Sequence, residues 1–294
     1  MIAVRVVNAA NSSCDIVMFA KYKISVQELL LFIGGDTRLT SYLKDVNFLN
    51  WEREQYAAYR GNCLHPVIFG KNGVIEAQVL GNEQFPIQKR HVFISHSSKD
   101  ADIAKVFAYI LSLLGIECFI DSMIWNNISD LQRELDERYC WLHRGTTFNY
   151  KKRNNSTAHV HTMLLTALFE MIDICECCVF IESDNSLIRL DDINDTNKKS
   201  TFSPWIFSEI NYIDKIRIKL PERHRTRLYS EGGALNESYE LKVVYPMDYI
   251  DSMITLTNKN FQNLCLYKRM NKYTSGEDML DILYGVTGII KKTY

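Results

Sequence analysis

The chain has 294 residues, enough for one large domain or two average ones and for a substantial hydrophobic core. It carries 34 Lys and Arg residues against 35 Asp and Glu residues, so the formal net charge of -1 creates no overall field that would attract nucleic acid or an anionic membrane. With 47% hydrophobic residues, 23% charged residues and 5 prolines, the composition excludes a disordered or fibrous chain, but it names no reaction.

Residues 1–90 are predicted to form a small α+β domain of their own, serving in sensing or oligomerisation. The predicted elements are strands at residues 2–7 and 15–19, a helix at 26–33, one or two helices within 43–59, and a β-hairpin at 67–80. Gly34 and Gly35 should stop the first helix, and the Asn72-Gly73 pair suits a tight hairpin turn. We expect the domain boundary at residues 81–90.

From residue 91 onward, strands alternate with helices, which predicts an α/β domain built on a parallel sheet. The predicted strands are residues 91–95, 116–120, 177–181 and 239–245, and the predicted helices are residues 103–114, 163–174, a segment starting near 204, and 276–292. Gly115 is a natural end for the first of these helices. Residues 123–159 form an unusually long connection, with a short helix at 130–139 followed by a polar, basic stretch.

The cysteine pattern favours buried thiols over disulfides or a metal site. The 8 cysteines are scattered, and Cys175, Cys177 and Cys178 lie in an apolar run where thiols behave as small hydrophobic side chains. Cys175 and Cys178 form a CxxC pair, but no second pair follows at zinc-finger spacing, so we expect no metal. The unpaired thiols, with no signal peptide or membrane span in the sequence, predict a cytoplasmic protein without a membrane partner.

Ligands of an open parallel sheet bind at the carboxyl ends of its strands, which singles out four polar segments. These segments are residues 96–100, Asp121-Ser122, residues 182–184 and residues 204–213. Neither GxGxxG nor GxxxxGK[ST] occurs, so hydride transfer and ATP hydrolysis have no support. Ser97 and Ser98 are able to hold a phosphate at a helix start, although most such residues only cap the helix.

Trp205 and Glu209 are four residues apart in a predicted helix, so they lie on one face with an indole next to a carboxylate. A carboxylate placed in this way can stabilise the positive charge that develops when a glycosidic bond breaks. The alternative is an amphipathic helix with a half-buried Trp and a solvated Glu. Taken alone, the two residues favour that alternative.

Two separated motifs resemble the Toll/interleukin-1 receptor (TIR) domain, especially its bacterial members. The run from Val92 to Asp100, followed by an apolar helix and by Phe119-Ile120-Asp121, resembles the opening of that domain. The segment Trp205-Ile206-Phe207-Ser208-Glu209 matches the WxxxE element of its NAD-cleaving members. The resemblance covers residues 91–294 and implies a flavodoxin-like parallel sheet.

The resemblance also implies an activity, namely cleavage of the nicotinamide-ribose bond of NAD by a glycohydrolase or cyclase. The products would be ADP-ribose, a cyclic ADP-ribose isomer or an ADP-ribosyl conjugate, and NAD would be a substrate with no further cofactor. Glu209 would be the catalytic carboxylate. The residues that contact NAD would be Trp205, His96, Ser97, Ser98 and Asp121.

The chain departs from the family pattern at two places. Ser97-Ser98 stands where some relatives carry Arg, and the connection at residues 123–159 is longer than the usual BB loop. Both departures favour the alternative function, a non-catalytic TIR scaffold or adaptor that acts through TIR-TIR interactions.

Similarity to the TIR subunit of Thoeris anti-phage systems implies antiviral signalling. The expected partners are then further copies of the TIR domain, a downstream effector that senses the nucleotide product, and a phage-derived activator. A basic stretch at residues 215–227 suggests nucleic acid more weakly, because a solvated face explains it as well. His159 and His161 suggest a metal only if they lie on a strand, and they lack further ligands.

Overall fold

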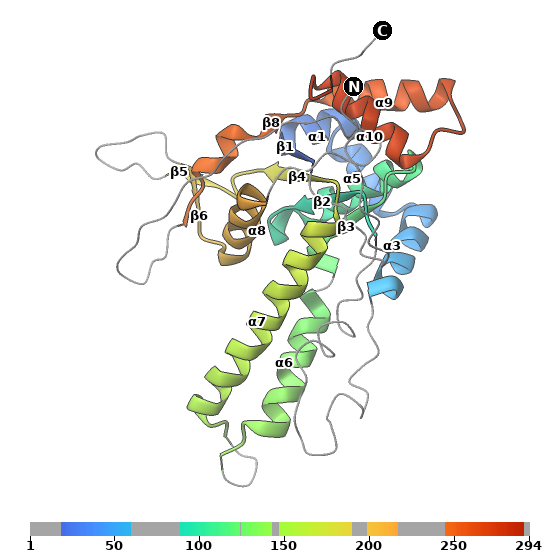
Figure 1. Ribbon diagram of the computed structural model, residues 1–294. Coiled ribbons are helices and arrows are strands. Elements are labelled where there is room, and N and C mark those ends of the chain that lie inside the picture. Colours follow the sequence, from blue (N-terminus) through green and yellow to red (C-terminus); the bar gives the residue numbers. More distant parts are fainter. Residues whose placement is uncertain are drawn as a thin grey trace, which may run out of the picture.

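The computed structural model describes residues 19–59, 89–123, 125–142, 147–189, 199–216 and 245–290 (Figure 1). Its centre is a five-stranded sheet with the order β3-β2-β4-β1-β8, in which all neighbouring strands run parallel. The strands are β1 (Ala20–Ser25), β2 (Val92–Ser95), β3 (Cys118–Ile120), β4 (Cys177–Glu182) and β8 (Ile254–Thr255). The predicted α/β class with a parallel sheet is therefore confirmed.

Helices cover both faces of the sheet. Lys21 and Tyr22 of β1 point to opposite faces, as successive strand residues do. Lys21 Nζ donates to the backbone oxygen of Asp214 in α8 at 3.0 Å, and Tyr22 Oη pairs with Thr287 Oγ1, just after α10, at 3.1 Å. The end of α7 (Tyr150–Ile174) packs against α8 (Pro204–Lys215). Besides α6, described below, the other helices are α1 (Val26–Ile33), α2 (Asp36–Leu43), α3 (Val46–Tyr59), α5 (Ala101–Leu113), α9 (Asn258–Met270) and α10 (Gly276–Val286).

β1 changes the predicted domain organisation. This strand lies between β4 and β8, with Ala20 opposite Cys177 and Tyr22 opposite Ile254. The helices that follow it, α1, α2 and α3, pack against α5. Residues 20–59 therefore share one sheet and one core with the later chain instead of forming a separate unit that ends at residue 90. The sequence suggested two separate domains because the pairing of β1 with β4 and β8, which lie far along the chain, leaves no local pattern in the sequence.

Most of the elements predicted after residue 90 are present within a few residues of their expected bounds. α5 ends at Leu113, and Gly115 has the left-handed φ of +87° that suits the turn into β3. β4 and the start of α8 also match. The strand predicted at residues 239–245 lies outside the described residues except for Tyr245. Tyr245–Pro246 (β7) belongs to a small antiparallel sheet with β5 (Ile188–Arg189) and β6 (Lys199–Thr201), and β1 takes the place beside β4.

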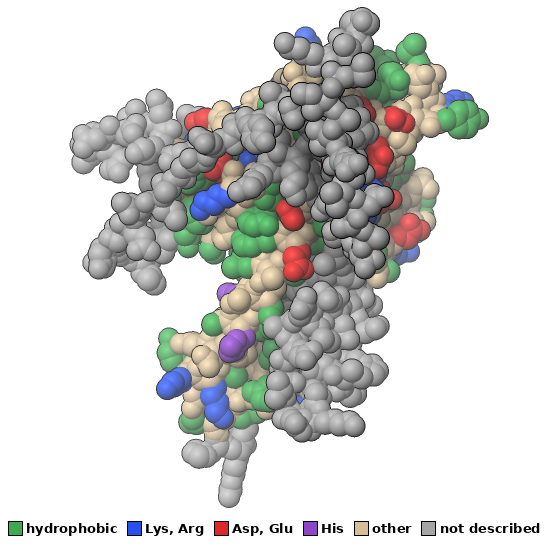
Figure 2. Space-filling view, viewed as in Figure 1, with side chains coloured by type: hydrophobic (Ala, Val, Ile, Leu, Met, Phe, Trp, Pro, Cys, Tyr) green, Lys and Arg blue, Asp and Glu red, His purple; other side chains and the backbone are tan. Residues whose placement is uncertain are grey.

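The long connection at residues 123–159 is largely helical, which corrects the prediction of a loop. α6 (Trp125–Tyr139) and the first half of α7 form an arm that projects from the body, and Lys and Arg side chains gather near its end (Figures 1 and 2). Asn149 caps α7, accepting a hydrogen bond from Lys152 N at 3.0 Å. Asp136, 2% exposed, accepts from Arg153 Nε at 3.0 Å. Leu131, Leu135 and Val160 are buried as well, so apolar packing and polar contacts together hold the arm.

The cysteines behave as predicted. Cys118, Cys175, Cys177 and Cys178 are free and buried in the core. Burial raises the pKa of each thiol, so these thiols are poor nucleophiles. Over the described parts of the chain, no group of three or more His, Cys, Asp or Glu side chains has the arrangement of a metal site. Among the same residues, no helix has the length and apolar character needed to span a membrane.

Candidate functional site

The candidate site lies where the carboxyl ends of β2 and β3 meet α8. Ser95 is the last residue of β2, and Asp121 begins a short 3-10 helix, η2 (Asp121–Met123), directly after β3. Because parallel strands end at the same edge of a sheet, these residues are neighbours. α8 begins with Pro204 and is capped by Ser203, whose Oγ accepts from Ile206 N at 3.2 Å. This start fixes the helix so that Glu209, one turn in, faces the sheet edge.

Glu209 is completely buried, with 0% of its surface exposed. Ser95 Oγ donates to Glu209 Oε2 at 2.6 Å. Its second oxygen, Oε1, accepts no hydrogen bond from the described residues, while the Asp121 side chain lies within hydrogen-bonding reach of the Glu209 carboxyl. The alternative of a solvated Glu on an amphipathic helix is therefore wrong.

The surroundings of Glu209 favour its protonated form. Burial raises the pKa of Glu209 well above its ordinary value of 4.5, and the negative charge of Asp121 raises that pKa further. The hydrogen bond from Ser95 acts in the opposite direction because it stabilises the carboxylate. Perturbed carboxyl groups of this kind concentrate at functional sites.

His96 joins the two strand ends. It is 3% exposed, and its Nε2 lies 2.9 Å from Ser122 Oγ. On the other side of the ring, Nδ1 lies 3.4 Å from Asp121 Oδ1. Asp121 Oδ1 also accepts the backbone N–H of Ser122 at 2.7 Å. The structure thus brings three of the predicted site residues, Glu209, Asp121 and His96, into one cluster.

Trp205 lies one helical turn before Glu209 and is half-buried. Its ring meets His161 of α7 edge to face, with the ring centroids 5.4 Å apart. Further along α8, Tyr212 stacks on Phe169 of α7 at 4.1 Å. α7 therefore braces the helix that carries Glu209. His159 and His161 lie within this helix, not on a strand, so the strand geometry that a metal pair would need is absent.

Of the two serines after β2, Ser97 has the capping role that the sequence left open. Ser97 caps a 3-10 helix, η1 (Ser98–Asp100), and accepts the backbone N–H of Lys99 at 3.4 Å, whereas Ser98 is exposed. Within the described residues, neither hydroxyl hydrogen-bonds to the carboxyl cluster. They border the site without being joined to it.

Sequence reasoning missed two features at this edge. The first is Ser95, which was interpreted only as the end of an apolar strand. The signal that could have identified it was a polar residue at the carboxyl end of such a strand. The second is a buried group around Asp100, which is 8% exposed. Asp100 Oδ2 accepts from Ser183 Oγ at 2.5 Å and Asp100 Oδ1 from Asn185 Nδ2 at 2.7 Å. These bonds tie the loop after β2 to the loop after β4.

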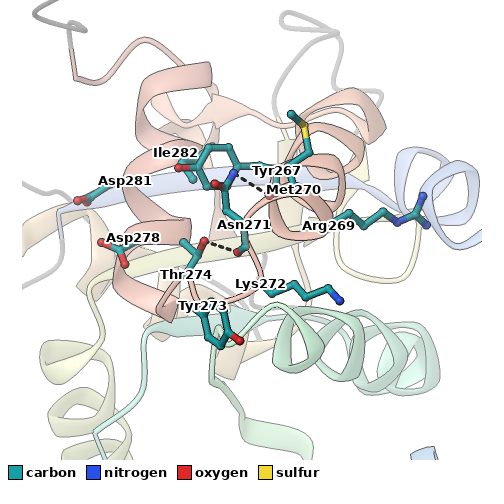
Figure 3. Close-up of a pocket in the computed structure, with 10 residues that line it drawn as sticks. All are labelled: Tyr267, Arg269, Met270, Asn271, Lys272, Tyr273, Thr274, Asp278, Asp281 and Ile282. Carbon is teal, nitrogen blue, oxygen red and sulfur yellow. Dashed lines mark hydrogen bonds between the residues drawn. The ribbon is translucent and has the colours of Figure 1, made fainter.

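A separate concavity of about 770 Å³ lies between α9 and α10 and contains none of the predicted site residues (Figure 3). Tyr273 at its rim is fully exposed. The hydrogen bonds drawn there, from Asn271 Nδ2 to the backbone oxygen of Tyr267 and from Thr274 Oγ1 to that of Asn271, close the turn between the helices. The concavity offers no buried acid or base comparable with Glu209.

Comparisons with protein-family models, with curated proteins and with solved structures find no significant match for this chain. What the protein does must therefore be inferred from its own residues.

Proposed function

We propose that the protein cleaves the nicotinamide-ribose bond of NAD, as an NAD glycohydrolase or ADP-ribosyl cyclase of the TIR type. The observation that supports this most is the buried Glu209 at the carboxyl edge of a parallel sheet, held by Ser95 and preceded one turn earlier by Trp205. The flavodoxin-like arrangement belongs to the same proposal. β3, β2 and β4 stand in the 2-1-3 order of that fold, while the fourth position is filled by β1.

The chemistry suits a single carboxylate. Nicotinamide leaves with the electron pair of the C–N bond, and the ribose C1′ becomes an oxocarbenium-like cation. The Glu209 carboxylate stabilises that cation. Water then adds to C1′, giving ADP-ribose and a proton, or an internal nucleophile adds instead and gives a cyclic isomer. In this mechanism the Trp205 ring lines the nicotinamide-ribose pocket, where an indole face attracts the cationic pyridinium. His96 and Asp121 border the same pocket.

The proposal extends to the biological setting that the sequence resemblance implies. Activity would depend on self-association, occur in the cytoplasm, respond to a phage-derived activator and produce a nucleotide that an effector protein senses. Each of these is open to direct measurement in infected cells.

The experiment uses the full chain at high concentration, incubated with NAD, with the products separated by chromatography and identified by mass spectrometry. Glu209→Gln should lower nicotinamide release by about 100- to 1,000-fold, because the stabilising charge is removed while the shape is kept. The matched control is Glu137→Gln, an exposed glutamate on α6, which should leave turnover unchanged. Full turnover by a folded Glu209→Gln protein would refute the proposal.

A non-catalytic TIR scaffold is the second candidate, and the complete burial of Glu209 favours it. A scaffold would self-associate in analytical ultracentrifugation yet release no nicotinamide at any concentration or with infected-cell extract added. Concentration-dependent release that Glu209→Gln abolishes would exclude it.

A further inference from the structure

The Glu209 carboxyl faces titratable groups on several elements. His96 follows β2, Asp121 begins η2, and Cys178 of β4 is a neutral buried thiol within electrostatic range. Lys21 of β1, which lies opposite Cys178, donates its hydrogen bond to the backbone oxygen of Asp214 and not to Glu209. Among these groups, Asp121 is the one whose side chain meets the Glu209 carboxyl.

Two ionised carboxylates have only acceptor oxygens, so their close approach in a buried site is repulsive. A single proton between them turns the same approach into a hydrogen bond. Glu209 Oε1 lacks any donor among the residues that the structure describes, and Ser95 already serves Oε2. A proton held with Asp121 satisfies the remaining oxygen. Asp121 keeps its own partners, since its Oδ1 accepts from Ser122 N at 2.7 Å and lies 3.4 Å from His96 Nδ1.

We propose that Asp121 is a positioning residue for Glu209: the two carboxyls hold one proton between them at rest, and Glu209 becomes a carboxylate when that proton passes to solvent. This inference rests on the proposed function for its consequence, since only the carboxylate stabilises the ribosyl cation. Asp121 begins η2, which comes just before α6 in the chain, and α7 braces α8 through Trp205 and Tyr212. The arm therefore connects the two elements that carry the proton-sharing pair.

The test compares the chain with Asp121→Asn, whose amide keeps the size of the side chain, removes the charge and donates to Glu209 Oε1. Subtracting the infrared spectrum of Glu209→Gln isolates the band of the protonated Glu209 carboxyl. The pH at which half of this band is lost is the midpoint that we compare. In Asp121→Asn the midpoint should fall by at least about one pH unit. Asp100→Asn is the matched control, because Asp100 is a buried carboxylate at the same edge bonded to Ser183 and Asn185; it should leave the midpoint unchanged.

Where Asp121→Asn fails to fold, Asp121→Ser removes the same charge with a smaller side chain, and circular dichroism confirms the fold of either variant. The pH profile of NAD cleavage supplies the second readout, and its acid limb should move to lower pH in the same variant. An unchanged infrared midpoint would overturn the inference, because burial alone would then hold the proton. A shifted midpoint in a protein that never cleaves NAD would leave the proton-sharing pair standing and refute the proposed function instead.

Discussion

Glu209 and Asp100 are both buried carboxyls at the carboxyl edge of one sheet, yet their hydrogen bonding differs. Asp100 accepts a side-chain donor on each oxygen, from Ser183 and from Asn185. Glu209 accepts one donor, Ser95, on Oε2; its Oε1 accepts none from the described residues, and the carboxyl group lies beside a second acid, Asp121. Buried polar groups in native proteins are normally satisfied, so the fully bonded Asp100 fits a structural clamp, and the incompletely satisfied Glu209 is the residue that we propose as the reactive centre.

The largest expected difference between Glu209 and Asp100 is in the rate of NAD cleavage. Glu209→Gln should reduce NAD cleavage by about 100- to 1,000-fold, whereas Asp100→Asn should stay within about tenfold of the parent chain, since Asp100 touches no reacting atom. Initial rates of nicotinamide release at saturating NAD measure both. Equal losses in the two variants would mean that the carboxyls do not differ in role.

The second largest effect concerns stability. Asp100→Ala leaves the Ser183 and Asn185 donors without their partner, and we expect a loss of about 2–3 kcal/mol in the free energy of unfolding. Urea denaturation measures it. Asp102→Ala, an exposed acid in the first turn of α5, is the control and should cost about 0.5 kcal/mol. A loss of that small size for Asp100→Ala would show that the two loops do not depend on the clamp.

The third prediction turns the pKa shift of Glu209 into a pH dependence of stability. In the unfolded chain this group ionises at its ordinary pKa of 4.5, and burial raises the folded-state pKa, so the folded state binds more protons above pH 4.5. Stability contributed by the protonated group is full below that pH and is lost as pH rises through the folded pKa. Glu209→Gln has no such loss, so at pH 8 its free energy of unfolding should exceed that of the parent chain. Urea titrations at pH 4 and pH 8 give the difference, which should shrink at the lower pH; a constant difference contradicts the assignment.

The smallest expected effect is at Ser95. Its hydroxyl lowers the pKa of Glu209, so Ser95→Ala should raise that pKa and move the acid limb of the activity profile upward by about one pH unit. Ser183→Ala removes a comparable hydroxyl from the Asp100 clamp and should leave the acid limb in place. Profiles that coincide for Ser95→Ala and the parent chain would remove Ser95 from the site.

Local sequence patterns predicted the individual helices and strands whose bounds depend on nearby residues. The apolar periodicity around Val106 and the stop at Gly115 identified α5, and Pro204 placed the start of α8. Of the arm, only the short helix at 130–139 was predicted, because the first half of α7, from Tyr150 onward, is polar and basic and offers little apolar periodicity. β1 was missed because its neighbours, Cys177 and Ile254, are distant in the sequence.

The candidate site likewise has a part that the sequence predicted and a part that it did not. Strand ends predicted the correct edge of the sheet, and the resemblance singled out Glu209, Asp121 and His96, which the structure groups together. The link from Ser95 to Glu209 joins residues 114 positions apart, so no spacing rule could reveal it. Ser97 and Ser98 were chosen for their place in the loop after β2; Ser97 caps η1 and Ser98 is exposed, and their contact with NAD stays a prediction.

The place of β1 also decides the order in which the molecule can be assembled. This strand is synthesised before both of its sheet neighbours, β4 and β8, which follow more than 150 residues later in the chain. Until Ile254 has been synthesised, one edge of the β1 segment has no partner, and the contacts that close the sheet carry the entropic cost of long loops. The sheet therefore closes only after residue 254 has been synthesised, and residues 20–59 cannot mature as an independent module.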